Sequence, residues 1–239
     1  MLPRTLGVAA PQINIMIVTA IASSLSAGAI SIFTFANNLQ QFPLGLIGIP
    51  FAMAAFPAFS QAWAAGEKKE FVSKFLSIFR KIIYIVVPLS ALIFILKSQI
   101  IEIVLKTGRF GGSAVALSAA CLGLFSLGIF ATCLIPLVFR AFFALRDTKT
   151  PTIIAVFAMI LNIALCFFFV NILSYQNCFS DFAIKIFSLQ GIDDISVIGL
   201  PLAFSLDSIF QLFLLIFFLF KKLNINFEGK YINPNKPIS

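Results

Sequence analysis

The residues of this chain best placed to do chemistry are four amides inside an apolar run. They are Asn37, Asn38, Gln40 and Gln41. No charged residue occurs between Arg4 and Glu67, and about 20 apolar residues are enough for one helix to cross the hydrocarbon core of a bilayer. The run is therefore long enough for two crossings. Amides inside it need hydrogen-bond partners, which a neighbouring helix or a substrate in a cavity could supply.

The amides belong to a polar stripe at helical spacing, because residues three and four positions apart share one face of a helix. The stripe consists of Thr34, Asn37, Asn38, Gln41, Gly45 and Gly48. In the preceding apolar segment Gln12, Thr19 and Ser23 form a weaker stripe that could face the same space. The stripe over 34–48 is consistent with lining a substrate cavity and equally with close packing between helices, and packing is the favoured interpretation of the weaker stripe. The cavity candidates are Asn37, Asn38, Gln41, Thr34 and Gln12.

Asp207 is the only acidic residue well inside an apolar segment. An unpaired carboxylate at mid-bilayer costs at least about 2.5–3.5 kcal/mol, so it should face the helix bundle or water. Gln211, one helical turn further on, is a candidate hydrogen-bond partner. Asp207 and Gln211 are therefore candidates for ion coupling or proton relay. The alternative is a protonated or hydrogen-bonded residue that serves packing.

The composition argues against an enzyme. The chain has no histidine, which removes the commonest general base and metal ligand, and it has no recognisable Ser-centred or Gly-rich catalytic motif. Its four cysteines lack CxxC spacing and suit packing positions. We expect no catalytic residue, no metal site and no cofactor. The net charge of +8 is explained by membrane topology and contact with anionic lipid head groups, so no nucleic-acid partner is expected.

These residues must be positioned by membrane helices. Hydrophobic residues make up 60% of the chain, 30 residues are Phe, and the mean hydropathy is +1.05, so the sequence predicts an all-α polytopic membrane protein. Cutting it at polar interruptions leaves six apolar segments, at about 7–27, 31–63, 75–96, 114–144, 151–172 and 196–220. We expect one six-helix lobe over 1–223 and a cytoplasmic tail over 224–239. A cleavable signal peptide is not expected.

The segment 31–63 is too long for one straight crossing and is rich in residues that disturb helices. Proline removes a backbone donor, so we expect this element to bend or break inside the membrane, as in transporters that change conformation. The alternative is that proline is simply commoner in membrane helices than in soluble ones. The hinge candidates are Pro43, Gly45, Gly48, Pro50 and Pro57.

The positions of Lys and Arg predict that both termini are cytoplasmic, because these residues concentrate in short cytoplasmic loops. Most of the 17 basic residues then lie inside, and Lys97, Lys106, Arg109 and Lys185 lie outside. A short amphipathic helix near 98–107 is expected to lie in the outer interface. The fourth and fifth helices are joined by a tight basic cytoplasmic turn. The charged residues that define this turn motif are Arg140, Arg146, Asp147 and Lys149.

Four motifs, read in order, carry a family resemblance. They are Phe35–Gly48, Phe56–Ser60, Leu105–Phe110, and Arg140–Ala144 with Asp147–Pro151. In order and spacing they closely resemble the MurJ (MviN) family of lipid II flippases, within the multidrug/oligosaccharidyl-lipid/polysaccharide flippase superfamily. The likeness covers about residues 4–220.

The resemblance implies one lobe of a two-lobe transporter. Members of this superfamily pair two six-helix lobes around a central cavity, and this chain resembles the C-terminal lobe alone. It implies transport of an undecaprenyl-pyrophosphate glycopeptide across the bacterial cytoplasmic (inner) membrane by alternating access, and hence a part in peptidoglycan biosynthesis, cell wall biogenesis and cell shape. The implied partners are this lipid-linked substrate, membrane lipids and an N-terminal lobe.

One departure from the family pattern concerns the substrate. Family members typically carry an arginine where this chain has Asn38, and an acidic residue or glutamine at Gln41. An amide can donate to a phosphate oxygen but lacks the charge-assisted bidentate contact of arginine. Pyrophosphate recognition would then rest on the other lobe. The alternatives are an exporter of another lipid-linked saccharide or of small cations, or an inactive membrane fragment or scaffold.

Overall fold

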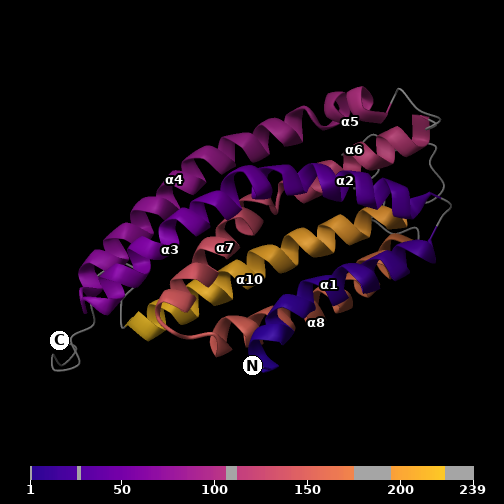
Figure 1. Ribbon diagram of the computed structural model, residues 1–239. Helices are drawn as coiled ribbons and strands as arrows, with labels where there is room; N and C mark the ends of the chain where they lie inside the picture. The colour runs from indigo at the N-terminus through magenta and orange to yellow at the C-terminus, as the bar shows by residue number, and fades with distance from the viewer. Residues whose placement is uncertain (1, 26–27, 106–111, 175–194, 224–239) are drawn as a thin grey trace, which may run out of the picture.

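The computed structural model describes residues 2–25, 28–105, 112–174 and 195–223, which form helices joined by short turns (Figure 1). Its elements are α1 Leu2–Ser23, α2 Ala29–Pro43, the π-helix η1 Leu44–Gly48, α3 Ile49–Ala64, α4 Lys68–Ile95, α5 Lys97–Leu105, α6 Gly112–Ser126, α7 Ile129–Ala144, α8 Lys149–Ser174, the 3₁₀-helix η2 Ser196–Ile198 and α10 Gly199–Leu223. No strand occurs within these ranges. The predicted all-α class is confirmed, and the expected tail at 224–239 lies outside the described residues.

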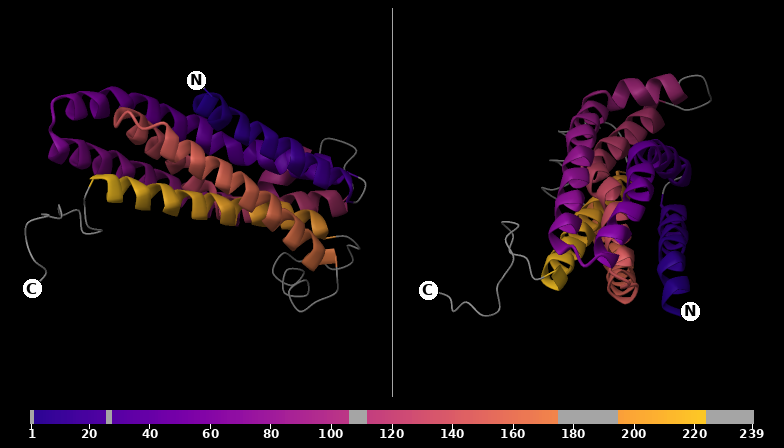
Figure 2. Two further views of the ribbon diagram at one scale, coloured as in Figure 1. Left: turned by 90° about the horizontal axis from the view of Figure 1, so that it is seen from below. Right: turned by 60° about the vertical axis from the view of Figure 1, so that its left-hand side comes forward.

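The helices form an elongated bundle, with α4 along one side, α1 and α8 along the other, and α7 and α10 between them (Figures 1 and 2). Neighbouring pairs include α1 with α8, α8 with α10, α2 with α6, and α3 with α7. Two apolar cores hold them together. One, around Phe59 and Phe142, joins α3, α4, α7 and α10. The other, around Phe33 and Phe125, joins α1, α2, α6, α8 and the start of α10.

Within the described ranges, four helical stretches are long and apolar enough to cross a membrane. They are Ala29–Ala64, Lys68–Ile95, Lys149–Ser174 and Ser196–Leu223. The pair α6 and α7 adds a fifth if it counts as one span bent by 45°, and α1 contributes the shorter apolar helix Gln12–Ser23. A chain that spans lipid must satisfy its backbone hydrogen bonds internally, which explains the all-helical architecture.

The predicted irregularity of the second segment takes the form of a π-helical turn. Ala29–Ala64 remains one helical stretch of 36 residues, in which η1 follows directly after Pro43. The Pro43 nitrogen has no hydrogen to donate, so the regular α-helical ladder is disturbed at this point. Such π-helical turns within α-helices are rare and occur frequently at functional sites. Pro50 lies in the first turn of α3, where proline is tolerated, and Pro57 lies inside α3.

The expected single helix 114–144 is instead two helices, α6 and α7, with the break at Leu127 and Gly128 rather than at Pro136. The cause is a contact from α10. The Ser205 hydroxyl donates a hydrogen bond to the Leu124 carbonyl at 2.8 Å. In a continuous α-helix the Gly128 N–H would donate to that carbonyl. The Gly128 N–H donates to Phe125 instead. A Cβ on Gly128 would lie 2.9 Å from Ser205 Cα, so the backbone at the α6–α7 break directly contacts the backbone of α10.

Two further elements differ at their ends from the predicted ranges. Helix α4 begins at Lys68, earlier than the expected 75, because its first turns pack on α3: Phe71 and Phe75 lie 5.4 and 6.1 Å from the Phe59 ring. The expected short helix near 98–107 is α5, Lys97–Leu105, with Ile101 fully buried. Residues 106 and 107 lie outside the described ranges.

Candidate functional site

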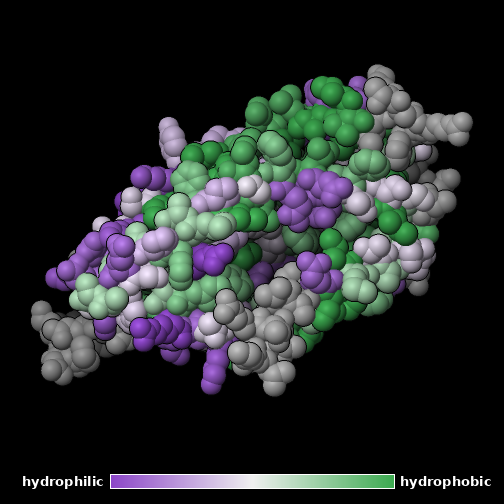
Figure 3. All heavy atoms as spheres, in the orientation of Figure 1, coloured by the Kyte–Doolittle hydropathy of each residue, from purple (hydrophilic) through white to green (hydrophobic). Residues whose placement is uncertain are grey.

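The polar stripe of α2 is divided between the surface and the interior. Thr34, Asn38, Gln41 and Gly45 are exposed. In Figure 3 hydrophilic side chains gather over α2 on the face turned to the viewer, beside a hollow between α2 and α1. An exposed polar strip on a membrane helix is costly against lipid, so this face of the lobe is suited to water or to another protein surface. We call these four residues the α2 stripe.

Asn37 lies on the other side of the helix. It is only 6% exposed, and its Oδ1 accepts a hydrogen bond from Gln40 Nε2 at 3.0 Å. Both follow Phe33 at helical spacing, and the Phe33 ring packs 5.7 Å from Phe125 of α6. The expectation that Asn37 shares the face of Asn38 is therefore wrong, because adjacent helical residues point about 100° apart.

Gly48 and Pro43 also serve packing. Both are buried, and a Cβ on Gly48 would lie 2.9 Å from the Cα and carbonyl oxygen of Cys133 in α7. Gly48 thus allows η1 and α7 to approach closely. Gly45 has nothing within 4 Å of the place a Cβ would take, so its surroundings are open.

Asp207 lies at a cavity of about 240 Å³ where α1, η1, α7, α8 and α10 converge. The cavity is lined by Asn14, Leu44, Thr132, Ile135, Pro136, Ala155, Ala158, Met159, Phe204, Asp207, Ser208 and Gln211. Asp207 is 7% exposed, and its Oδ1 is buried without a hydrogen-bond partner. Gln211 lines the same cavity, but within the described residues the two make no hydrogen bond with each other. Leu44, in the cavity wall, follows Gln41 of the α2 stripe by three positions.

Sequence reasoning missed two amides that have a buried atom without a hydrogen-bond partner. Asn14 lines the same cavity from α1, and its Oδ1 is also buried without a partner. Asn162 in α8 is fully buried, with its Nδ2 unpartnered and its Oδ1 facing the Cys166 thiol at 3.7 Å. Both could have been found as amides in apolar segments. The predicted Gln12 is exposed on α1 and is not among the residues that line the cavity.

The cavity presents oxygen atoms that lack donors. The Thr132 and Ser208 hydroxyls donate to carbonyls of their own helices, so neither satisfies the Asn14 or Asp207 oxygen. The Asn14 and Asp207 oxygens are therefore buried hydrogen-bond acceptors that no described donor satisfies. In the part of the chain that the structure describes, no three His, Cys, Asp or Glu side chains gather to hold a metal ion.

The turn between α7 and α8 is held by Asp147. Its carboxylate accepts from the backbone N–H groups of Lys149 and Thr150 at 3.0 and 3.1 Å, from the Thr150 hydroxyl at 2.7 Å, and from Lys222 at the end of α10. Partial burial alone would raise the pKa of Asp147, but the bonds from Lys222 and Thr150 outweigh it and lower that pKa to about 2.

The other three charged residues of this turn motif have separate roles. Arg146 adopts a left-handed backbone conformation with a φ of 57°, which turns the chain between the two helices. The Arg140 guanidinium lies 5.8 Å from the centre of the Phe56 ring and ties α7 to α3. Lys149 is exposed, and only its backbone takes part in the turn. Asp147 is therefore the residue that organises the motif.

Long apolar helices packed around a cavity that holds a carboxylate, with an exposed polar strip on one of them, define a polytopic α-helical membrane protein. A family model described as lipid II flippase MurJ matches residues 1–233. The chain therefore belongs to the MurJ family.

Several curated proteins are similar to the chain over part of their length. A probable lipid II flippase MurJ of Buchnera aphidicola subsp. Acyrthosiphon pisum is 30% identical over 161 residues, which is 67% of this chain and 31% of the relative. The lipid II flippase MurJ of Burkholderia cenocepacia is 28% identical over 74% of this chain and 34% of its own length. A relative from Buchnera aphidicola subsp. Schizaphis graminum is 26% identical over 95% and 40%. The chain thus spans about a third of the length of the curated relatives it matches.

A solved structure shares the fold. It is a lipid II flippase MurJ in an inward closed conformation, which matches with a TM-score of 0.72 and 21% identity over 91% of this chain and 41% of that one. The arrangement of helices described above is therefore that of part of a MurJ protein.

Proposed function

We propose that this chain forms the C-terminal lobe of a lipid II flippase that works by alternating access together with an N-terminal lobe. Membership of the MurJ family carries the proposal. The chain spans about a third of its relatives' length, so the transport activity is assigned to the assembly of this lobe with a second one. The lobe itself serves as a transporter part and not as an enzyme.

The α2 stripe is the part of this lobe that faces the transport path. Its exposed hydroxyl and amide groups need water or a polar partner, and a cavity between two lobes supplies both. These groups are neutral, so they contribute hydrogen bonds to a lipid-linked substrate and no charge. The cations that neutralise an undecaprenyl pyrophosphate then come from the second lobe.

Asp207 is the proposed ion-coupling residue. Its buried Oδ1 and that of Asn14 lack donors in one cavity, which supports binding of a proton or a small cation there. The cavity lies among α1, α7, α8 and α10, so occupancy by an ion would change how these helices pack. Gln211 takes part as a wall residue of the same cavity.

The lobe is assigned to the bacterial cytoplasmic membrane with both termini in the cytoplasm. The Asp147 to Lys222 contact brings the α7–α8 turn beside the end of α10. The cations of both elements and of the α3–α4 turn then gather at one end of the bundle, which supports a cytoplasmic position for that end. The basic residues there are Lys68, Lys69, Arg140, Arg146, Lys149, Lys221 and Lys222.

The experiment is complementation of a conditional lipid II flippase depletion strain. One arm expresses this chain alone, and the other co-expresses it with an N-terminal MurJ lobe from the same genome. We expect growth only in the second arm. Failure of both arms, with both proteins inserted and stable, would contradict the assignment and favour another lipid-linked saccharide, small cations, or a scaffold without transport. Growth with the chain alone would contradict the need for a second lobe.

A further inference from the structure

The exposed face of α4 changes character along its length. From Tyr84 onwards it is apolar and open, with Tyr84 84%, Leu92 52% and Ile95 70% exposed. Before Tyr84 the same side carries hydroxyls and cations at helical spacing. They are Ser73, Ser77, Arg80 and Lys81, and all four are exposed. Figure 3 shows hydrophilic side chains over the first half of α4 and hydrophobic ones over the second. We call Ser73, Ser77, Arg80, Lys81 and Tyr84 the α4 stripe.

Within the described part of the chain, Arg80 and Lys81 have no acidic partner. The nearby Lys74 is different, because it pairs with Glu70 at 2.6 Å one turn earlier. The α4 stripe therefore presents two cations and two hydroxyls whose hydrogen-bonding capacity the lobe itself does not use. An arginine beside a lysine and hydroxyls is a donor set that suits a phosphate group.

The length of α4 places this donor set just inside one face of the hydrocarbon core, within reach of the lipid head groups. About 15 residues separate Lys81 from Lys97, which is roughly 22 Å of helix, whereas the hydrocarbon core is about 30 Å thick. The backbone of Arg80 and Lys81 therefore lies within the bilayer and not in water. Their side chains must reach along the helix to head groups, and the local bilayer must thin towards them. Tyr84, with an apolar ring and a polar tip, is the residue type found at this boundary.

We propose that the α4 stripe is a binding site for an anionic phospholipid, with the phosphate on Ser77, Arg80 and Lys81 and the acyl chains along Tyr84, Leu92 and Ile95. Charge complementarity selects the acidic head group, and the continuous apolar face selects a lipid over a soluble anion. The site lies on the opposite side of α4 from its packing against Phe59, so it is separate from the α2 stripe and from the Asp207 cavity. It does not depend on the proposed transport activity.

The test is native mass spectrometry of the full chain in detergent, titrated with phosphatidylglycerol and, as a neutral reference, phosphatidylcholine. We expect the Arg80→Gln/Lys81→Gln double variant to bind phosphatidylglycerol about tenfold more weakly, with phosphatidylcholine binding unchanged. Ser73→Ala/Ser77→Ala keeps every charge and should weaken phosphatidylglycerol binding about threefold. Arg80→Lys/Lys81→Arg should retain binding.

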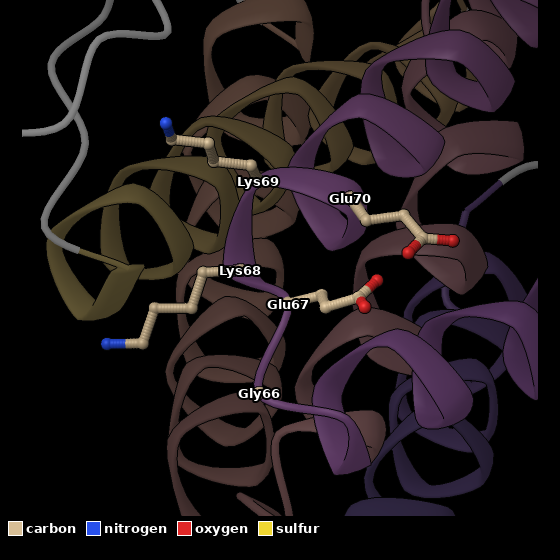
Figure 4. Close-up of a pocket in the computed structure, with 5 residues that line it drawn as sticks. All are labelled: Gly66, Glu67, Lys68, Lys69 and Glu70. Atoms are coloured by element: carbon tan, nitrogen blue, oxygen red, sulfur yellow. The ribbon is translucent and has the colours of Figure 1, made fainter.

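The matched control is Lys68→Gln/Lys69→Gln, a second tandem pair of cations on the same helix. Both side chains point outwards from the α3–α4 turn, away from Glu67 and Glu70 (Figure 4). They lie about 18 Å further along the helix, beyond the apolar face. The affinity for phosphatidylglycerol should change by less than twofold in this variant. An equal loss in both double variants, or no loss in the α4 stripe variants, would overturn the site. Displacement of the lipid by inorganic phosphate at equal concentration would overturn it in favour of a free anion.

Discussion

Lys222, at the end of α10, contacts the Asp147 carboxylate in the α7–α8 turn, 75 positions earlier in the chain. The same carboxylate caps the first turn of α8 through the N–H groups of Lys149 and Thr150. One side chain thus fixes the start of α8 and ties it to the end of α10. These two helices pack along each other, and both line the cavity at Asp207.

Removal of the Asp147 carboxylate should destabilise the lobe. Loss of a helix cap costs about 1 kcal/mol, and loss of a partly buried ion pair adds to it, so Asp147→Ala should cost about 2 kcal/mol. Thermal unfolding in detergent, followed by circular dichroism, measures the change. Lys222→Gln should lose less, because the cap remains. Lys221→Gln, one position away and exposed, serves as the control, and an equal loss there would show that general charge and not this contact matters.

The lobe should become less stable as the pH is lowered through the range in which Asp147 takes up a proton. Its pKa is lowered from 3.8 to about 2, so the folded chain releases this proton more readily than the unfolded chain. The stabilisation is therefore complete above about pH 4 and is lost as the pH falls towards 2. Unfolding temperatures of the parent and Asp147→Asn should converge across that window. A constant difference between them down to pH 2 would refute the assignment.

The α2 stripe makes a direct prediction for transport. Asn38→Leu should abolish growth in the two-lobe complementation assay without loss of expression, because it places an apolar side chain in the proposed path. Asn171→Leu is the matched control, since it makes the same change at an exposed asparagine near the end of α8. If Asn38→Leu supports growth as well as Asn171→Leu does, the stripe belongs to packing or lipid contact instead.

The helices could be predicted from the sequence because long apolar runs leave the backbone no other way to satisfy its hydrogen bonds in lipid. The faces of α2 could not be predicted fully. Asn37 and Asn38 are adjacent and chemically identical, and the packing of α2 on α6, which includes the contact between Phe33 and Phe125, determines which of them is buried. The break between α6 and α7 was likewise hidden, because its cause is Ser205, 81 positions from the carbonyl it contacts.

The candidate cavity could be predicted only in part. Asp207 could be singled out as a lone carboxylate in an apolar segment, and that reasoning needs no knowledge of its neighbours. Asn14 could not be connected with it, because the two lie on helices at opposite ends of the chain. Only the packing of α1 and α10 around α8 brings both to one cavity.

Two glycines of η1 should respond oppositely to the same substitution. A Cβ at Gly48 would stand 2.9 Å from the Cys133 backbone, which cannot move aside without shifting α7, so Gly48→Ala should cost about 1–3 kcal/mol of stability. Gly45 has open space, and Gly45→Ala should be neutral or stabilise the helix by up to about 1 kcal/mol. Unfolding temperatures of the two variants compare them directly, and similar values would contradict the close approach of η1 and α7.

Neutralising the two aspartates should change stability in opposite directions. Asp147 is fully bonded, so Asp147→Asn should destabilise the lobe, whereas Asp207 has a buried oxygen without a donor, so Asp207→Asn should leave stability unchanged or raise it by about 1 kcal/mol. If Asp207 couples ion movement to transport, Asp207→Asn should also abolish growth in the two-lobe assay while the protein remains folded and inserted. Normal growth together with lost stability would instead make Asp207 a hydrogen-bonded packing residue, because removal of a structural carboxylate weakens the fold and leaves the transport cycle intact.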